Sequence, residues 1–145
     1  YFECDEGQGM GITILNEEPD HSILVETVAW LPGRGIAPHD HQTWAVFGVA
    51  EGEERMQSYR CNALAENHFA SLELTETQKL KPGEAQALPH DIIHAVSNTT
   101  PKGQPAISIH VYGRDLRHSG RYEYDPERGV RYPNANEEFI DVITP

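Results

Sequence analysis

Two histidines that could bind a metal ion stand two residues apart in the segment "APHDHQTWAVFGVAEG". Neutral imidazole nitrogens are common ligands of zinc and iron, so His39 and His41 are candidates for two ligands of one metal ion. No carboxylate follows within the next half-dozen residues to complete such a site. An HxH pair alone is more often part of a polar loop than of a metal site. If these two histidines do bind a metal ion, its remaining ligands must come from elsewhere in the chain.

A second set of reactive side chains lies in the segment "PAISIHVYG", where Ser108, His110 and Tyr112 alternate with apolar residues. Successive side chains in a β-strand point to opposite faces, so these three share one face. The same rule places the imidazoles of the HxH pair on a common face. Taken alone, the Ser-His-Tyr set is also compatible with a solvent-facing strand edge, because exposed faces are usually polar.

A third candidate ligand, His94, begins the apolar segment "HAVSN" far along the chain from the HxH pair. If the fold brings it to His39 and His41, three imidazoles can hold one metal ion. The other histidines lie among polar residues and are expected at the surface: His21, His68, His90 and His118.

The elements that must position these residues are short apolar segments with almost no helical periodicity. They are separated by turn segments such as "LPGRG", "AEGEE" and "LKPGEA", in which Gly and Pro favour a change of direction. Such spacing is typical of an all-β sandwich or barrel. We expect strands at Ile12–Leu15, Ile23–Leu31, Thr43–Ala50, Met56–Arg60, Ala70–Leu80, Ala85–Leu88, His94–Asn98 and Pro105–Gly113.

Two further expectations concern the less regular parts of the chain. The segment "CNALAEN" near residue 61 is the one place where a helical turn is expected. The chain after Arg114 is expected to be loop, with a last strand near Val130–Tyr132.

Composition limits the classes of function. A length of 145 residues suits a single domain spanning residues 1–145. The formal net charge is −12, from 11 Lys+Arg against 23 Asp+Glu, which disfavours nucleic acid and anionic lipid as partners. No export leader or membrane span is expected, so we predict a cytoplasmic protein, either a monomer or a small homo-oligomer. In a reducing compartment Cys4 and Cys61 are expected to stay thiols.

The segments "PGRGIAPHDHQTWAVFGVAEG" and "LPHDIIHAVSN" resemble the two motifs of cupins. Within cupins the chain is most similar to the thiol dioxygenases of the cysteine dioxygenase family, particularly the bacterial 3-mercaptopropionate dioxygenase branch. Four features carry this resemblance over residues 31–125: Trp44 shortly after HDH, the hairpin "GVAEGEE", the position of His94, and the strand "SIHVY". The resemblance implies an all-β cupin fold, the double-stranded β-helix or jelly-roll-like barrel.

The resemblance also implies roles for individual residues. It makes His39, His41 and His94 the ligands of Fe(II), and it makes Ser108, His110 and Tyr112 a hydrogen-bonded triad beside the iron. Ala45 falls where most cupins have a Glu ligand and where the mammalian enzyme has a Cys crosslinked to the triad Tyr. Since alanine can be neither, no crosslink is expected, and Cys61 lies too far along the chain to replace that Cys.

The group that binds the substrate carboxylate is where the chain departs from the family. Cysteine dioxygenases use an Arg on an early strand, whereas the corresponding segment "GITILN" offers Thr13 and no Arg. This difference argues against cysteine as the preferred substrate. In the mercaptopropionate branch an Arg follows the triad Tyr before an Asp-Pro turn, which matches Arg121, with Arg114 and Arg117 as nearby substitutes.

Three neutral imidazoles would leave the full double charge of Fe(II) in the site, which favours an anionic thiolate. We therefore expect addition of O2 to the sulfur of a small thiol carboxylate, giving a sulfinate. In this reaction Tyr112 donates a hydrogen bond into the site, His110 orients Tyr112, and Ser108 sets the tautomer of His110.

The sequence is also compatible with three-histidine cupins of other functions. They include a zinc hydrolase, a dioxygenase that cleaves carbon–carbon bonds, and a metal-binding cupin without turnover. The Ser-His-Tyr set favours the thiol dioxygenase, because neither a hydrolase nor a binding protein has an evident need for it.

Overall fold

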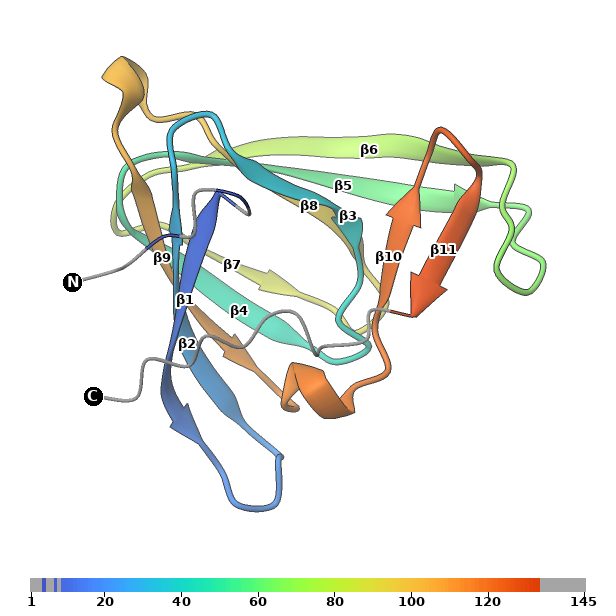
Figure 1. Cartoon of the computed structure of the whole chain (residues 1–145), viewed down its shortest axis with the longest axis horizontal. Coiled ribbons are helices and arrows are strands. Elements are labelled where there is room, and N and C mark those ends of the chain that lie inside the picture. The colour runs from blue at the N-terminus through green and yellow to red at the C-terminus, as the bar shows by residue number, and fades with distance from the viewer. Residues whose placement is uncertain (1–3, 5–6, 8, 134–145) are drawn as a thin grey trace.

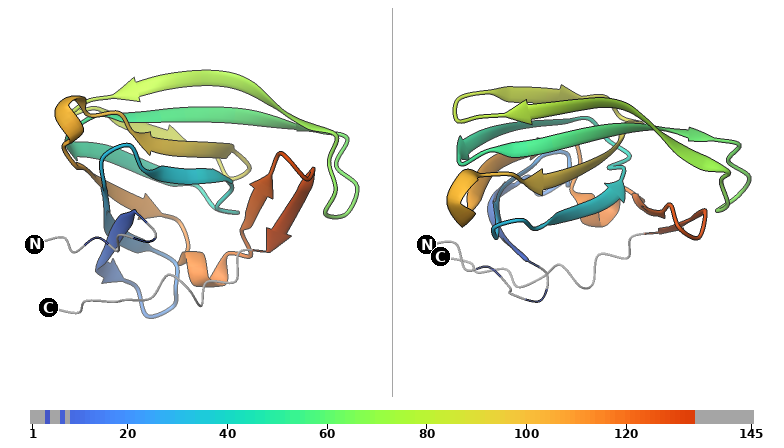
Figure 2. Two further views of the ribbon diagram at one scale, coloured as in Figure 1. Left: turned by 45° about the horizontal axis from the view of Figure 1, so that its top comes forward. Right: turned by 90° about the horizontal axis from the view of Figure 1, so that it is seen from above.

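The computed structural model describes residue 4, residue 7 and residues 9–133. These residues form two antiparallel sheets that face each other, as Figure 1 and the two further views of Figure 2 show. The predicted all-β fold is confirmed. Among the described residues, none lies in a helix with the length and apolar character needed to cross a membrane.

The first sheet has five strands, in the order β1 (Met10–Glu17), β2 (Leu24–Trp30), β9 (Ala106–Tyr112), β4 (Ala45–Glu51) and β7 (Ala85–Leu88). The second sheet has six, in the order β11 (Val130–Pro133), β10 (Tyr122–Asp125), β3 (Gly35–His39), β8 (Ile93–Asn98), β5 (Glu54–Asn62) and β6 (Ser71–Leu80). Two short 3-10 helices complete the described elements, η1 (Pro101–Gly103) and η2 (Leu116–His118).

The apolar core lies between the sheets. Phe47 of β4 and Met56 of β5 come from opposite sheets and belong to the same buried cluster. A second cluster, around Trp30 and Val96, fills the space nearer β1. Each such side chain contributes roughly 1.5–3 kcal/mol when it is removed from water. These two clusters therefore hold the sheets together around the polar residues of the interior.

Two strands were missed by the sequence analysis. Gly35–His39 forms β3, and Tyr122–Asp125 forms β10 within the part that was expected to be loop. The segment of β3, GIAPH, alternates poorly between apolar and polar residues, and that of β10, YEYD, alternates over only four residues. Both strands therefore depend on pairing with their neighbours. Gly35 shows this dependence, because a Cβ atom there would stand 2.2 Å from the carbonyl oxygen of Val96 on β8. The last expected strand is confirmed as β11.

The helical turn expected near residue 61 is wrong. Strand β5 continues to Asn62, and the chain then forms a loop in which Ala63 and Glu66 have φ angles of 53° and 54°. A right-handed helix needs negative φ at every residue, so these two positions exclude it. The loop instead reaches the β10–β11 hairpin, where His68 forms an isolated bridge with Val130 (Figure 1).

Candidate metal centre

The three predicted ligands converge inside the fold. His39 is the last residue of β3, and His94 on β8 is its cross-strand partner. His41 lies just beyond the end of β3, so strand alternation is not what places its imidazole beside that of His39. The Nε2 atom of His41 is nevertheless 3.2 Å from that of His39 and 3.3 Å from that of His94.

These distances fit a shared metal ion. Three nitrogens bound to one metal at about 2.1 Å, in tetrahedral or octahedral geometry, stand about 3.0–3.4 Å from one another. The Nδ1–H of His39 donates to the carbonyl of Ala37, at 2.9 Å, which leaves a lone pair on its Nε2. The cluster of His39, His41 and His94 is a metal site candidate, and all three residues are buried.

Burial also keeps the three imidazoles neutral. Desolvation lowers the pKa of His39 to about 4 and the pKa values of His41 and His94 well below their usual range. Metal ligation by histidine requires the neutral ring, so no proton has to be removed at pH 7 before a metal binds. The donor set thus suits a divalent transition metal, with no protein carboxylate in the cluster.

The middle residue of the HxH pair is turned away from the cluster. The Asp40 side chain accepts hydrogen bonds from the backbone N–H of Tyr122 and from the hydroxyl of Tyr124, both at 2.9 Å. The backbone N–H of Asp40 donates to the carbonyl of Tyr122 at 3.0 Å. These hydrogen bonds to β10 fix the backbone at Asp40 and so hold His39 and His41 in position for the cluster.

Strand β9 supplies a hydrogen-bonded chain beside the three histidines. The Ser108 hydroxyl lies 2.8 Å from Nε2 of His110, and Nδ1 of His110 lies 2.8 Å from the hydroxyl of Tyr112. All three side chains are buried, and β9 lies between β2 and β4, so this face is not a solvent-facing strand edge. The Tyr112 ring meets the ring of His41 edge-on, with centroids 4.9 Å apart.

A cavity of about 80 Å³ opens beside the cluster. Its apolar wall comes mainly from β1 and β2, with Ile12, Ile14 and Val28 among its residues. Its polar end comprises the three histidines, His110, Tyr112, Glu26 and Arg121. Thr13 is not among the described residues that line it, because its side chain lies on the other face of β1 from Ile12 and Ile14.

The three arginines considered as carboxylate anchors differ in position. Arg121 is buried and lines the cavity, whereas Arg114 is exposed and is not among the lining residues that the structure describes. Arg117 lines the cavity but is engaged with the carboxylates of Asp115 and Glu17. Arg121 is thus the arginine that is both buried and part of the cavity lining, and its role as anchor stays a prediction.

Glu26 is a buried acid in this cavity that the sequence analysis missed. Burial raises the pKa of its carboxyl to about 7, and the nearby charge of Arg121 partly offsets that shift. The Tyr112 hydroxyl lies close enough to the Glu26 carboxyl to lower its pKa slightly against the effect of burial. A lone acidic residue within the apolar run "ILVETVAWL" was the available signal, since a charged residue is rarely buried without a partner.

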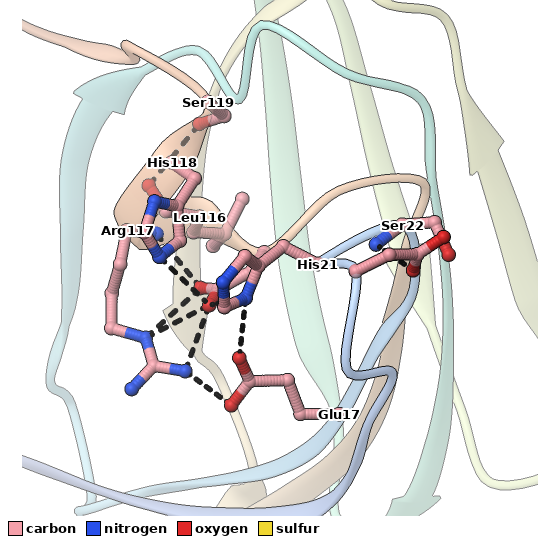
Figure 3. A network of polar contacts seen from close by, with 9 residues as sticks. Glu17, His21, Ser22, Leu116, Arg117, His118 and Ser119 are labelled. Carbon is pink, nitrogen blue, oxygen red and sulfur yellow. Dashed lines mark hydrogen bonds and ion pairs between the residues drawn. The ribbon is translucent and has the colours of Figure 1, made fainter.

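A separate polar network ties the β1–β2 loop to the chain that follows β9 (Figure 3). Arg117 donates to Asp115 through Nε, at 3.0 Å from each carboxylate oxygen, and also pairs with Glu17. His21 bonds Glu17 at 2.8 Å and stacks on His118 with centroids 4.0 Å apart. His21, Asp115 and His118 lie close enough to hold a metal, but the Asp115 carboxylate already pairs with Arg117. We therefore treat this network as an ion-pair cluster.

Comparison with known proteins identifies the fold. No family model and no curated protein matches the chain. Among solved structures, an oxalate oxidase in complex with the substrate analogue glycolate matches with a TM-score of 0.62 and 18% identity, over 82% of this chain and 57% of the other. KdgF from Halomonas sp. matches with a TM-score of 0.56 and 20% identity, over 77% and 86% of the two chains.

A cupin superfamily protein from Desulfitobacterium hafniense also matches, with a TM-score of 0.56 and 12% identity, over 78% of this chain and 84% of the other. The present chain thus spans little more than half of the oxalate oxidase chain. These similarities show that the chain has a cupin fold, as predicted. The cluster of His39, His41 and His94 in this chain is a possible metal site.

Proposed function

We propose that this chain is a mononuclear non-haem iron(II) thiol dioxygenase. It adds both oxygen atoms of O2 to the sulfur of a small thiol carboxylate resembling 3-mercaptopropionate, and the thiolate becomes a sulfinate. The observation that carries this proposal is the buried Ser108–His110–Tyr112 chain, which ends at a ring that contacts the metal-site histidine His41. Fe(II) bound by the three histidines would supply the redox centre for the thiolate and O2.

The charge of the site supports an anionic substrate. All three candidate ligands are neutral, so the protein ligands cancel none of the charge of a divalent metal. A thiol has an ordinary pKa near 8.5, and a nearby cation favours its thiolate form. Arg121 adds one more positive charge at the polar end of the cavity. A substrate that carries both a thiolate and a carboxylate complements both charges.

The residues of the chain have distinct tasks in this proposal. Tyr112 donates a hydrogen bond toward the substrate, His110 holds the Tyr112 hydroxyl, and Ser108 holds the far nitrogen of His110. Arg121 pairs with the substrate carboxylate through its planar guanidinium. The apolar wall around Ile12 and Ile14 excludes water from the carbon chain of a small substrate. Catalysis then depends on the placement of charges and donors and needs no protein nucleophile.

The most direct experiment measures metal content and O2 uptake together. The purified chain should contain iron by elemental analysis and should consume O2 when 3-mercaptopropionate is added. With labelled O2, mass spectrometry should find two labelled oxygen atoms in the sulfinate. Cysteine and mercaptosuccinate test the range of thiols that are accepted. Turnover supported by zinc alone, or no O2 consumption with any small thiol, would rule the proposal out.

A further inference from the structure

Glu54 is a fully buried acid that is not among the described residues lining the cavity. It lies at the start of β5, and its side chain points into the fold with those of Met56 and Ser58, at 1% exposure. Neither of its carboxylate oxygens has a hydrogen bond of good geometry to any described residue. The buried indole nitrogen of Trp30 likewise has no such bond.

Two polar groups, the Ser108 hydroxyl and the Trp30 indole N–H, lie close enough to the Glu54 carboxyl to lower its pKa, which burial raises. Both come from the first sheet, so Glu54 faces them across the interior from the second sheet. Neither group is a cation. A carboxylate that is removed from water without a positive partner is costly, whereas the neutral acid needs only a donor and an acceptor nearby. The Ser108 hydroxyl can accept from that acid, and the indole N–H can donate to it.

We propose that Glu54 is a positioning residue that acts as a neutral acid, donating to the Ser108 hydroxyl and so setting the direction of every hydrogen bond toward Tyr112. This inference rests on the proposed function, because it concerns the donor that Tyr112 offers to the substrate.

The direction follows from the number of hydrogens along the chain. If Glu54 donates to the oxygen of Ser108, the Ser108 hydrogen goes to Nε2 of His110. A neutral His110 then carries its hydrogen on Nδ1 and donates it to the oxygen of Tyr112. The hydrogen of Tyr112 is left to point to the cavity side, where Glu26 and the substrate lie.

If Glu54 is ionised instead, the Tyr112 hydroxyl no longer donates a hydrogen bond to the cavity. An ionised Glu54 accepts the Ser108 hydrogen, so His110 must donate from Nε2, and its Nδ1 accepts the hydrogen of Tyr112. Tyr112 then offers only lone pairs to the cavity. Burial lowers the pKa of His110 to about 3, so the ring has one hydrogen and cannot donate in both directions. The chain therefore has two alternative directions, and Glu54 selects between them.

Two substitutions of similar length separate this role from simple packing. Glu54→Gln keeps a donor for Ser108 and an acceptor for Trp30, whereas Glu54→Met keeps the shape and removes both. In the full chain with diamagnetic zinc in the metal site, nitrogen NMR reports which nitrogen of His110 carries hydrogen. We expect the Nδ1–H form in the unmodified chain and in E54Q, and a loss of that preference in E54M.

The iron-loaded enzyme provides the second measurement. E54M should lose about 10- to 100-fold in kcat at unchanged iron content, while E54Q should stay close to the unmodified enzyme. An unchanged His110 tautomer in E54M would overturn the inference, and so would an E54Q that is as impaired as E54M. If E54M does not fold, Ser108→Ala breaks the same connection and must change the tautomer. The NMR result does not depend on turnover, so it remains decisive if no thiol is oxidised.

Discussion

Ala45 on β4 lies directly opposite Tyr112 on β9 in the antiparallel ladder of the first sheet. Both side chains are buried on the same face, where paired Cβ atoms stand about 4.5–5.5 Å apart. The side chain at position 45 therefore lies next to Tyr112, whose ring in turn contacts the ring of His41. A glutamate there would bring a carboxylate to the histidine cluster, and a cysteine would reach the tyrosine. Alanine does neither, which leaves the cluster all-imidazole.

We predict that Ala45→Glu changes the charge preference of the site. A carboxylate beside the metal cancels one unit of its charge and takes a coordination position, so binding of a thiolate should weaken. The KM for 3-mercaptopropionate should rise about tenfold or more, while the affinity for iron increases. Oxygen-uptake kinetics and a chelator competition measure the two effects. Ala45→Gln has nearly the same shape, and equal results for both variants would assign the effect to crowding.

The role of His94 as a ligand is tested by metal content. We expect His94→Ala to lose stoichiometric iron after dialysis against a weak chelator, because two imidazoles hold a divalent metal less well than three. His68 is exposed and serves as the control, since His68→Ala should keep the iron of the unmodified chain. Full iron retention in the His94 variant would show that His94 is not a ligand.

The carboxylate anchor is tested by comparing an acidic thiol with a thiol that has no carboxylate. Arg121→Ala removes a buried cation from the cavity, so the KM for 3-mercaptopropionate should rise about 10- to 100-fold. Cysteamine carries an ammonium group in place of the carboxylate, so the loss of the Arg121 cation should not raise its KM. The exposed Arg114 provides a matched control, for which Arg114→Ala should affect neither substrate. Equal increases for both thiols in the Arg121 variant would remove Arg121 from substrate recognition.

Glu26 should oppose the binding of an acidic substrate when it is ionised. Its pKa is raised to about 7, chiefly by burial, so its negative charge beside Arg121 develops between about pH 6 and pH 8. We expect Glu26→Gln to lower the KM for 3-mercaptopropionate at pH 8 and to change it much less at pH 6. Ionisation of the thiol affects the unmodified chain and the Glu26→Gln variant equally, so it cancels in the ratio of their KM values. A ratio that does not vary with pH would contradict this role.

The buried acids also predict how stability varies with pH. Glu26 and Glu54 have pKa values raised from 4.5 to about 7 in the folded chain, mainly by burial. The folded state therefore keeps protons that the unfolded state releases, and the free energy of unfolding falls as pH rises from about 4.5 to about 7. Each group should contribute a decrease of about 3 kcal/mol.

Urea unfolding at pH 5 and pH 8 measures this decrease. The stability that these acids contribute is fully present below pH 4.5 and is lost by the time the pH has passed 7. Glu54→Gln has no proton to lose, so its decrease between the two pH values should be smaller than that of the unmodified chain. An equal decrease in both proteins would show that Glu54 has an ordinary pKa.

Local patterns were sufficient for the fold class and for most strands. Alternation along "AISIHVY" placed Ser108, His110 and Tyr112 on one face, because that alternation is a property of any extended backbone. Strands β3 and β10 were missed, since their pairing depends on distant neighbours such as Val96 and on the hydrogen bonds of Asp40. The loop after Asn62 was misjudged because composition does not reveal a positive φ angle.

The sequence by itself determined which residues could form the centre: an HxH pair, a later histidine, a Ser-His-Tyr set, and an alanine in place of a carboxylate. Only the tertiary structure decided that these residues meet, because His39 and His94 become neighbours through pairing of strands that are far apart in the chain. It also decided that Glu26 and Glu54 are buried and that Arg121 is directed to the cavity. Burial and the charges that surround a group depend on long-range contacts, and no local pattern of residues encodes them.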